Sequence, residues 1–348
     1  MVGRLSAGIA IAVSGLVAAA GPAGACGGLV GENGSIQLVR TATLAAYHEG
    51  IERYVTSFEF VGEGAEVGSI VPLPDIPTSV ERGGDWTLQR LSLEVAPPAA
   101  ERSFATAAND AAGEAEVLLE TKIDALDITI LRGGGDEVGR WALEHGYFLT
   151  PDAPEVLDFY AARSPIFMAA RFDATRAQEL GQTSGDGTPI MLTIPTDQPW
   201  VPLRILALGL DATQTVDADV FLLTDDKPKL LAGGRGLNLE RSEAASTALL
   251  DDLRSDKGME WTPSSMWLTY LRVQAEARDL VYDLAVSTSP TVSPSITDVG
   301  IDVPEARAVT AGSAGTPVWP IAAGVSAAIA AFVVLRSLRP RSSRADAS

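Results

Sequence analysis

The side chains that could do chemistry in this chain are mostly carboxylates, because it has 45 acidic residues, two histidines and one cysteine. Asp217 and Asp219 are two residues apart on an expected strand, so their carboxylates would point the same way and could share a Ca²⁺ ion. The same spacing is typical of the solvent-facing side of a strand. No acidic pair lies in a calcium-loop pattern. Asp217 and Asp219 are therefore the candidate metal ligands, and we assign no cofactor.

Nucleophilic catalysis would need a base beside a nucleophile, and only His48 and His145 could be a histidine base. His48 lies in a polar stretch that predicts a turn. His145 lies in the last turn of an expected helix, where the helix dipole would stabilise a partly charged imidazole. Zinc is not expected, because these residues and one cysteine do not form a ligand spacing. We predict no catalytic residue. Paired carboxylates of a hydrolase stay open, since no pair can be selected.

Tryptophan beside proline is the clearest binding clue. Trp200 lies between Pro199 and Pro202, and Trp261 and Trp267 flank a further proline. Such groups form rigid apolar surfaces that suit peptide or sugar contact. They also fill cores and sheet edges.

The elements that would position these residues are mainly strands. Alternating apolar and polar residues predict strands at 36–39, 54–60, 67–71, 87–95, 123–131, 166–172, 189–194, 201–208, 216–223 and 281–287. Helical spacing predicts helices at 136–146, 154–162, 240–257 and 267–277. The alanine-rich residues 97–116 predict a loop. Because strands come in runs, the expected fold class is α+β, a strand-rich mixed exported domain with a few helices, plus one C-terminal transmembrane helix.

Both ends of the chain indicate export. Ala23 and Ala25 form a small-x-small cleavage site after an apolar stretch, as in a secretory signal peptide. Cys26 follows, at the position where a lipoprotein would be acylated, and that alternative stays open. Residues 318–335 carry no charge, and arginines follow them, so a membrane span with a cytoplasmic C-terminus is expected. The expected segments are a signal peptide (1–25), an extracytoplasmic α+β domain (26–287), a Ser/Thr/Pro/Ala-rich stalk (288–317), a transmembrane helix (318–335) and a basic cytoplasmic tail (336–348).

The charge of the chain narrows its partners. The net charge is −19, which repels nucleic acid and anionic headgroups but leaves cations and basic partners open. A single cysteine excludes an intramolecular disulfide.

A set of sequence motifs extends over most of the expected exported domain. The most distinctive is the run WALEHGY at residues 141–147. The others are the Cys-Gly pair at 26–27 and the segments 71–77, 157–160, 167–172, 189–194 and 200–205. The set resembles the bacterial family catalogued as domain of unknown function 2330, and residues 97–116 depart most from its pattern. The resemblance implies a secreted or surface location and, in some members, a C-terminal membrane segment. It implies no activity, substrate or catalytic residue.

The expected function is a single-pass, membrane-anchored extracytoplasmic module of the bacterial cell envelope. It would bind a protein partner or an envelope component without catalysis. The alternative is a carboxylate-dependent envelope hydrolase, with or without a divalent cation, and a third possibility is a stabilising subunit of a membrane complex. An enzyme should show a deep pocket with converging acids of perturbed pKa, and a binding module an exposed apolar patch or an open sheet edge.

Overall fold

The computed structural model of the protein describes residues 28–31, 37–61, 67–95, 115–147, 149–182 and 188–300. The chain divides into two units, Met1–Ile301 and Asp302–Ser348, and the described residues all belong to the first. The expected signal peptide with Ala23, Ala25 and Cys26, the loop at 97–114, the transmembrane helix and the tail lie outside them. Within the described residues, no helix has the length and apolar character needed to cross a bilayer.

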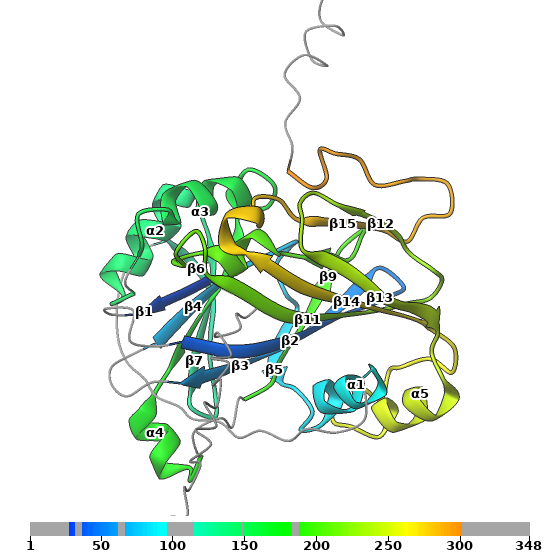
Figure 1. Cartoon of the computed structure of the whole chain (residues 1–348). Helices are drawn as coiled ribbons and strands as arrows, with labels where there is room; N and C mark the ends of the chain where they lie inside the picture. The colour runs from blue at the N-terminus through cyan, green and yellow to red at the C-terminus, as the bar shows by residue number, and fades with distance from the viewer. Residues whose placement is uncertain are drawn as a thin grey trace, which may run out of the picture. The chain divides into compact units, whose positions relative to one another are not determined.

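Strands form two large sheets and one small sheet in the described part of the chain (Figure 1). The five-stranded sheet consists, in spatial order, of β1 (Gly28–Gly31), β4 (Val67–Leu73), β8 (Ile166–Phe172), β7 (Leu126–Arg132) and β6 (Glu116–Ile123). The seven-stranded sheet consists of β13 (Leu237–Ala244), β14 (Trp267–Glu276), β11 (Thr215–Thr224), β2 (Gln37–His48), β3 (Ile51–Val61), β9 (Ile190–Pro195) and β5 (Ser79–Arg82). The small sheet consists of β10 (Trp200–Val201), β15 (Leu284–Ser287) and β12 (Lys229–Ala232). The β11–β2 pair is parallel and the other pairs are antiparallel.

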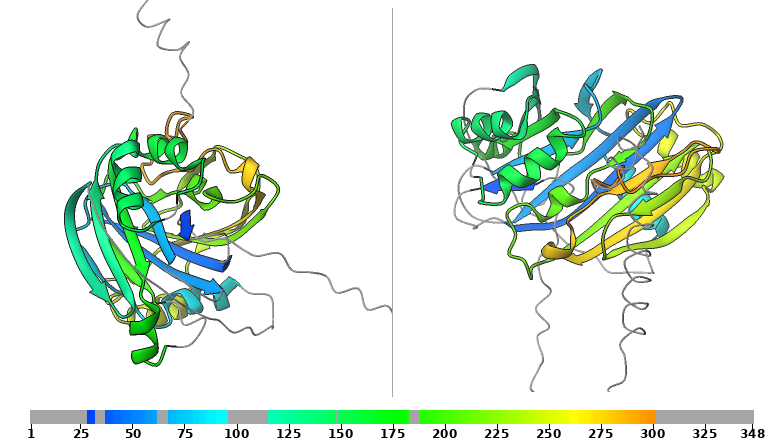
Figure 2. Two further views of the ribbon diagram at one scale, coloured as in Figure 1. Left: turned by 90° about the vertical axis from the view of Figure 1, so that its left-hand side faces the viewer. Right: turned by 90° about the horizontal axis from the view of Figure 1, so that it is seen from above.

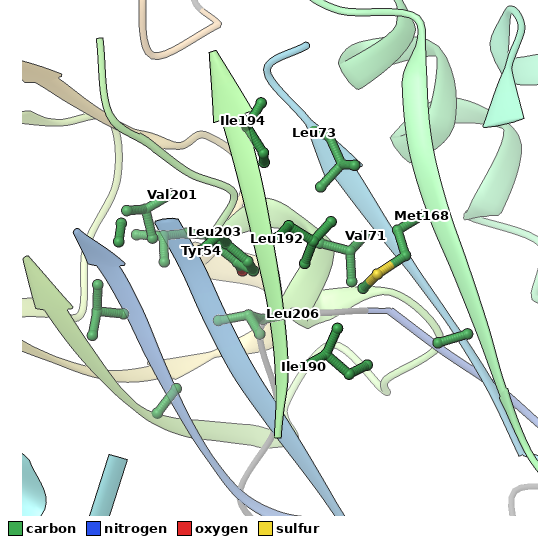
Figure 3. Packing of buried hydrophobic residues seen from close by; sticks show 14 of the residues in the cluster. Tyr54, Val71, Leu73, Met168, Ile190, Leu192, Ile194, Val201, Leu203 and Leu206 are labelled. Carbon is green, nitrogen blue, oxygen red and sulfur yellow. The ribbon is translucent and has the colours of Figure 1, made fainter. Parts of the chain in front are cut away.

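Helices cover the outer faces of the two large sheets and give the domain four layers. Strand β8 is apolar on both faces, so both faces are covered. On one face Phe167 and Ala169 pack with α2 (Gly135–Glu144) and α3 (Ala153–Ala161). The two helices lie side by side (Figure 2). Met168 faces the other way, toward the seven-stranded sheet, as Figure 3 shows. On the far face of that sheet, α1 (Thr87–Val95) and α5 (Thr247–Arg254) pack together. A short helix, α4 (Ala174–Glu179), and two 3₁₀ turns, η2 (Arg204–Ala207) and η3 (Ala277–Asp279), complete the described elements.

The predicted strand-rich, mixed α+β fold is confirmed. Where local pattern and tertiary contacts agree, the elements also match. The predicted helix at 136–146 is α2, that at 154–162 is α3, and the strand at 166–172 is β8. The strand predicted at 216–223 is the centre of β11.

Four predicted elements were wrong in type. Residues 87–95 were expected as a strand but form α1, with Leu88, Leu91 and Val95 at helical spacing on its packed side. Residues 201–208 contain Pro202 and form the last residue of β10 followed by η2. The expected helix at 240–257 is strand β13 followed by α5, whose N-cap Ser246 accepts a hydrogen bond from the Leu249 amide.

The fourth wrong prediction is the helix expected at 267–277, which is strand β14. This strand lies between β11 and β13 and buries residues on both faces. Its sequence therefore lacks the alternation that marks a half-buried strand, and a short apolar run of this kind can be read as helix.

Candidate functional site

A buried carboxylate, Asp283, ties the small sheet to α3 and η2. Its Oδ1 accepts hydrogen bonds from the Tyr160 hydroxyl at 2.7 Å and from the backbone amides of Leu203 and Arg204 at 2.9 and 3.0 Å. Its Oδ2 accepts from Arg163 Nη1 at 2.5 Å. Burial, and then the neighbouring Asp283 charge, raise the pKa of Tyr160 well above its usual value, so its hydroxyl stays protonated and donates. Four donors thus hold one carboxylate in place.

One wall of a cleft rises from this anchored region. Residues 195–201 run from the end of β9 through β10, and their backbone is held against the β2–β3 hairpin. The Thr196 amide donates to the Gly50 carbonyl at 3.0 Å, and the Tyr47 hydroxyl donates to the Asp197 carbonyl at 2.9 Å. The hairpin can turn so tightly because Glu49 and Gly50 both adopt positive φ, at 51° and 77°.

The opposite wall consists of β15 and the residues that follow it. The Gln198 side chain accepts from the Thr288 amide at 2.9 Å and so joins the two walls at one end. Lys229 Nζ donates to two carbonyls of the following loop, at 2.8 and 3.0 Å, and Arg163 donates to the Asp298 carbonyl. The first residues of the expected stalk therefore pack on the domain. The stalk beyond residue 300 lies outside the described residues.

Between the two walls is a cleft of about 890 Å³ with uncompensated negative charge. Its charged lining residues are Asp75, Asp197, Asp298 and Arg163. Arg163 is neutralised by Asp283, whereas none of the three acids forms an ion pair with another described residue. The cleft therefore presents three carboxylates that a cationic group can approach.

The aromatic residues singled out in the sequence do not form one surface. Trp200 lines the cleft, but the Arg163 guanidinium lies 4.7 Å from its ring centre and covers one face. The Arg53 guanidinium lies over Trp261 at 4.1 Å, and Trp267 donates a hydrogen bond to a serine hydroxyl at 2.9 Å. Of these three tryptophans, Trp200 is the one that contributes to the cleft.

Glu52, which the sequence did not single out, lies fully buried on β3. Its Oε2 accepts from the Trp200 amide at 3.1 Å, and its Oε1 has no hydrogen-bond partner among the described residues. Burial raises the pKa of Glu52 to about 8, although the Trp200 hydrogen bond opposes the shift. The sequence held one signal of this burial: Glu52 is two residues before Tyr54 and therefore lies on the same side of the strand. The strand was expected to begin only at Tyr54.

The candidate metal ligands are held by protein donors. Asp217 forms two hydrogen bonds with Arg272, at 3.1 and 2.7 Å, and Asp219 accepts from the Tyr270 hydroxyl at 2.7 Å. Other neighbouring aspartates also have protein partners: Asp225 contacts His48, Asp251 pairs with Arg254 and Asp252 with Arg90. No group of three or more His, Cys, Asp or Glu side chains is placed to hold a metal in the described part of the chain.

The two histidines end different elements, and their ring nitrogens contact a carboxylate and a backbone carbonyl oxygen. His48 ends β2, with Nδ1 at 2.6 Å from Asp225 Oδ1. His145 caps the C-terminus of α2, with Nδ1 at 2.8 Å from the Trp141 carbonyl oxygen and its ring stacked on Trp141 at 3.7 Å. Burial lowers the pKa of His145 despite this hydrogen bond. Its imidazole is therefore protonated less readily than a free imidazole, which opposes the dipole-stabilised charge that we expected.

Comparison with known proteins gives one family and one solved structure. A family model described as an uncharacterised protein conserved in bacteria (DUF2330) matches residues 19–229. This range includes the cleft wall at 195–201 and ends before the opposite wall. No curated protein matches the sequence. The crystal structure of baculovirus P35 is similar over 74% of this chain and 98% of that chain, with 10% sequence identity and a TM-score of 0.40.

Proposed function

This chain belongs to the DUF2330 family of uncharacterised proteins conserved in bacteria, and from that premise we propose that it is an extracytoplasmic binding module of the cell envelope. The signal-peptide pattern and the uncharged residues 318–335 support export and a C-terminal anchor. The domain binds a basic segment of a protein partner in the cleft between residues 195–201 and 284–298.

The charge of the cleft carries this proposal. Asp75, Asp197 and Asp298 line it without ion pairs to other described residues, and the chain has a net charge of −19. Such a field attracts a cationic segment and accelerates its association, more at low salt than at high salt. A volume of about 890 Å³ accommodates several side chains of an extended segment.

The carboxylate-dependent hydrolase is the second candidate, and the site supports it less. A pair of catalytic carboxyl groups needs one member with a raised pKa, close to the other and open to substrate. Among the described residues, Glu52 is the carboxyl group with a resolved upward pKa shift, and it is fully buried.

A cross-linking experiment in intact cells tests the binding role. A photoreactive amino acid replaces the exposed Ser293 on the cleft wall of the full-length protein, and in a control it replaces the exposed Glu240 on β13. We expect one discrete adduct from position 293 that weakens as ionic strength rises. No adduct, or the same adducts from both positions, would contradict the proposal.

Charge neutralisation tests the basic character of the partner. The triple variant Asp75→Asn, Asp197→Asn, Asp298→Asn keeps the side-chain acceptors that hold the Ile76 and Ser295 amides. We expect the adduct at position 293 to need about tenfold more partner, because three exposed charges each contribute a few tenths of a kcal/mol or more.

A matched control removes the same charge elsewhere, at three exposed acids on α2, α4 and β13: Asp136→Asn, Glu179→Gln and Glu240→Gln. If both triple variants weaken the adduct equally, the effect belongs to the net charge of the protein and not to the cleft.

A further inference from the structure

A second, separate pocket of about 540 Å³ opens where the end of α2 meets β6, β7 and β8. Its floor is a row of charges across three strands, since Lys122 pairs in register with Asp127, and Asp127 with Arg171. Lys122 Nζ lies 2.8 Å from Asp127 Oδ1, and Arg171 Nη1 donates to the His145 carbonyl at 3.2 Å. The floor is thus linked to the C-terminal end of α2.

Aromatic rings form the wall above this floor. Trp141 stacks on His145, with ring centres 3.7 Å apart, and the Tyr147 ring lies 5.7 Å from Trp141. Tyr147 can pack this close to β4 because Gly68 has no side chain: a Cβ there would lie 2.1 Å from the Tyr147 ring. The Trp141 side chain is buried, and its indole Nε1 has no hydrogen-bond partner among the described residues. The wall is therefore apolar.

Some charged side chains of this pocket are not fully paired with other described residues. Burial would raise the pKa of Asp127, but hydrogen bonds from Lys122 and Arg176 lower it, so this acid is ionised and already paired. Glu120 lies two residues before Lys122 on β6, on the same side of the strand, and forms no ion pair with another described residue. The Lys122 side chain is 71% exposed, and its contact with Asp127 uses one of three donors. An acid and a cation about 7 Å apart thus face the same pocket.

We infer that this pocket binds a small zwitterion with the chemistry of an apolar or aromatic α-amino acid. The ligand's ammonium group meets Glu120, its carboxylate meets Lys122, and its side chain packs on the Trp141–His145 wall. A polyanion such as a nucleotide would be repelled by Glu120 and by the acidic domain. A wholly apolar ligand would leave the charged floor desolvated without partners. The size fits, because small-ligand pockets usually measure about 300–1,000 Å³.

Three forms of one ligand test this inference by calorimetric titration of the full-length protein. Phenylalanine carries both charges, N-acetylphenylalanine lacks the ammonium group, and phenylalaninamide lacks the carboxylate. We expect saturable binding of the free amino acid and about tenfold weaker binding of each capped form, because each loses one charge contact. A dipeptide, Phe-Phe, carries both charges but on different residues. Weaker binding of the dipeptide supports a single α-amino acid as the ligand, and comparable binding contradicts it.

Two substitutions assign the charges to residues. Glu120→Gln should bring free phenylalanine down to the affinity of the N-acetyl form, and Lys122→Gln should bring it down to that of the amide. Glu116→Gln, on the same strand but outside the pocket, should leave all affinities unchanged. No binding of the free amino acid at millimolar concentration would overturn the inference. Binding that neither pocket substitution alters would overturn it as well. The cross-linking at position 293 does not depend on either result.

Discussion

At the scale of single residues, Glu52 should make the stability of the domain depend on pH. Its pKa is about 8 in the folded protein and near the ordinary 4.5 in the unfolded chain, so the folded state binds more protons between these values. Stability therefore falls as pH rises from about 4.5 to about 8 and changes little outside that window through this group. Glu52→Gln removes the titration and keeps an oxygen that can accept from the Trp200 amide. We expect the variant to be about 3 kcal/mol more stable at pH 7 than the wild type.

Urea unfolding of both proteins at pH 5, 7 and 8.5 measures this effect. The difference in free energy of unfolding should grow with pH and level off near pH 8. Glu240→Gln, at an exposed position, controls for the loss of one surface charge. A pH-independent difference between Glu52→Gln and the wild type would show that Glu52 does not titrate in this range.

The Asp283 carboxylate should be the most costly polar group of the cleft region to alter. Asp283→Asn leaves the Arg163 guanidinium without its counter-charge and offers one acceptor oxygen where the carboxylate offers two. We expect a loss of about 3 kcal/mol, as for other broken buried ion pairs. Thermal unfolding checks this, with Asp251→Asn, which alters an exposed pair with Arg254, expected to cost under about 1 kcal/mol. Equal costs would mean that the buried network does not hold the walls together.

Single-residue chemistry could be predicted from the sequence only where it depended on nearby residues. The placement of Asp217 and Asp219 on one strand followed from their spacing. Their partners did not, because Arg272 and Tyr270 come from β14 and depend on the register of two distant strands. Glu52 escaped notice for the same reason: its burial depends on neighbouring strands.

At the scale of elements, α1 should depend on a residue far along the chain. Asp256 Oδ2 accepts from the amides of Trp86 and Thr87, at 3.2 and 2.8 Å, and from the Thr87 hydroxyl at 2.7 Å. It thereby caps the N-terminus of α1. Asp256→Ala should lower the free energy of unfolding by about 2 kcal/mol, because three donors lose their acceptor. Urea unfolding measures the change.

Gly84→Ala provides an independent check on that cap. A Cβ at position 84 would lie 2.0 Å from Asp256 Oδ2, so the carboxylate would have to leave the helix end. We expect a loss similar to that of Asp256→Ala, and a double variant that is little worse than either single one. Additive losses would indicate that the two positions act on different interactions.

The dependence of α1 on Asp256 also explains which elements the sequence could predict. Helices α2 and α3 carry local signals: Glu137 accepts from the Gly134 amide at the start of α2, and Pro154 lies in the first turn of α3. By contrast, Leu91, Leu93 and Val95 of α1 alternate in a way that suits a strand, and the N-terminal cap of α1 comes from the distant Asp256. The strands β13 and β14 are likewise decided by mutual pairing. Local signals thus predicted these two helices, and mutual pairing decided the two strands.

At the scale of the whole molecule, the two proposed sites differ in how far the family model covers them. The amino-acid pocket involves residues 120–171 and lies inside the matched range, whereas one wall of the acidic cleft lies beyond residue 229.

The last prediction concerns the membrane anchor expected at residues 318–335. A chain that ends at Thr316 lacks residues 318–335 and should be released from the membrane fraction, because an uncharged segment of that length would be the main source of membrane affinity. Cell fractionation of the wild-type and shortened proteins measures this directly. Cys26→Ser in the shortened chain separates the remaining possibility, since an acyl chain on Cys26 would hold the N-terminus. Release of the shortened chain supports the C-terminal anchor. Retention that is lost in the Cys26→Ser variant would instead assign the anchor to an acyl chain at the N-terminus. The domain that carries the cleft and the pocket would then be held to the membrane by its N-terminal end.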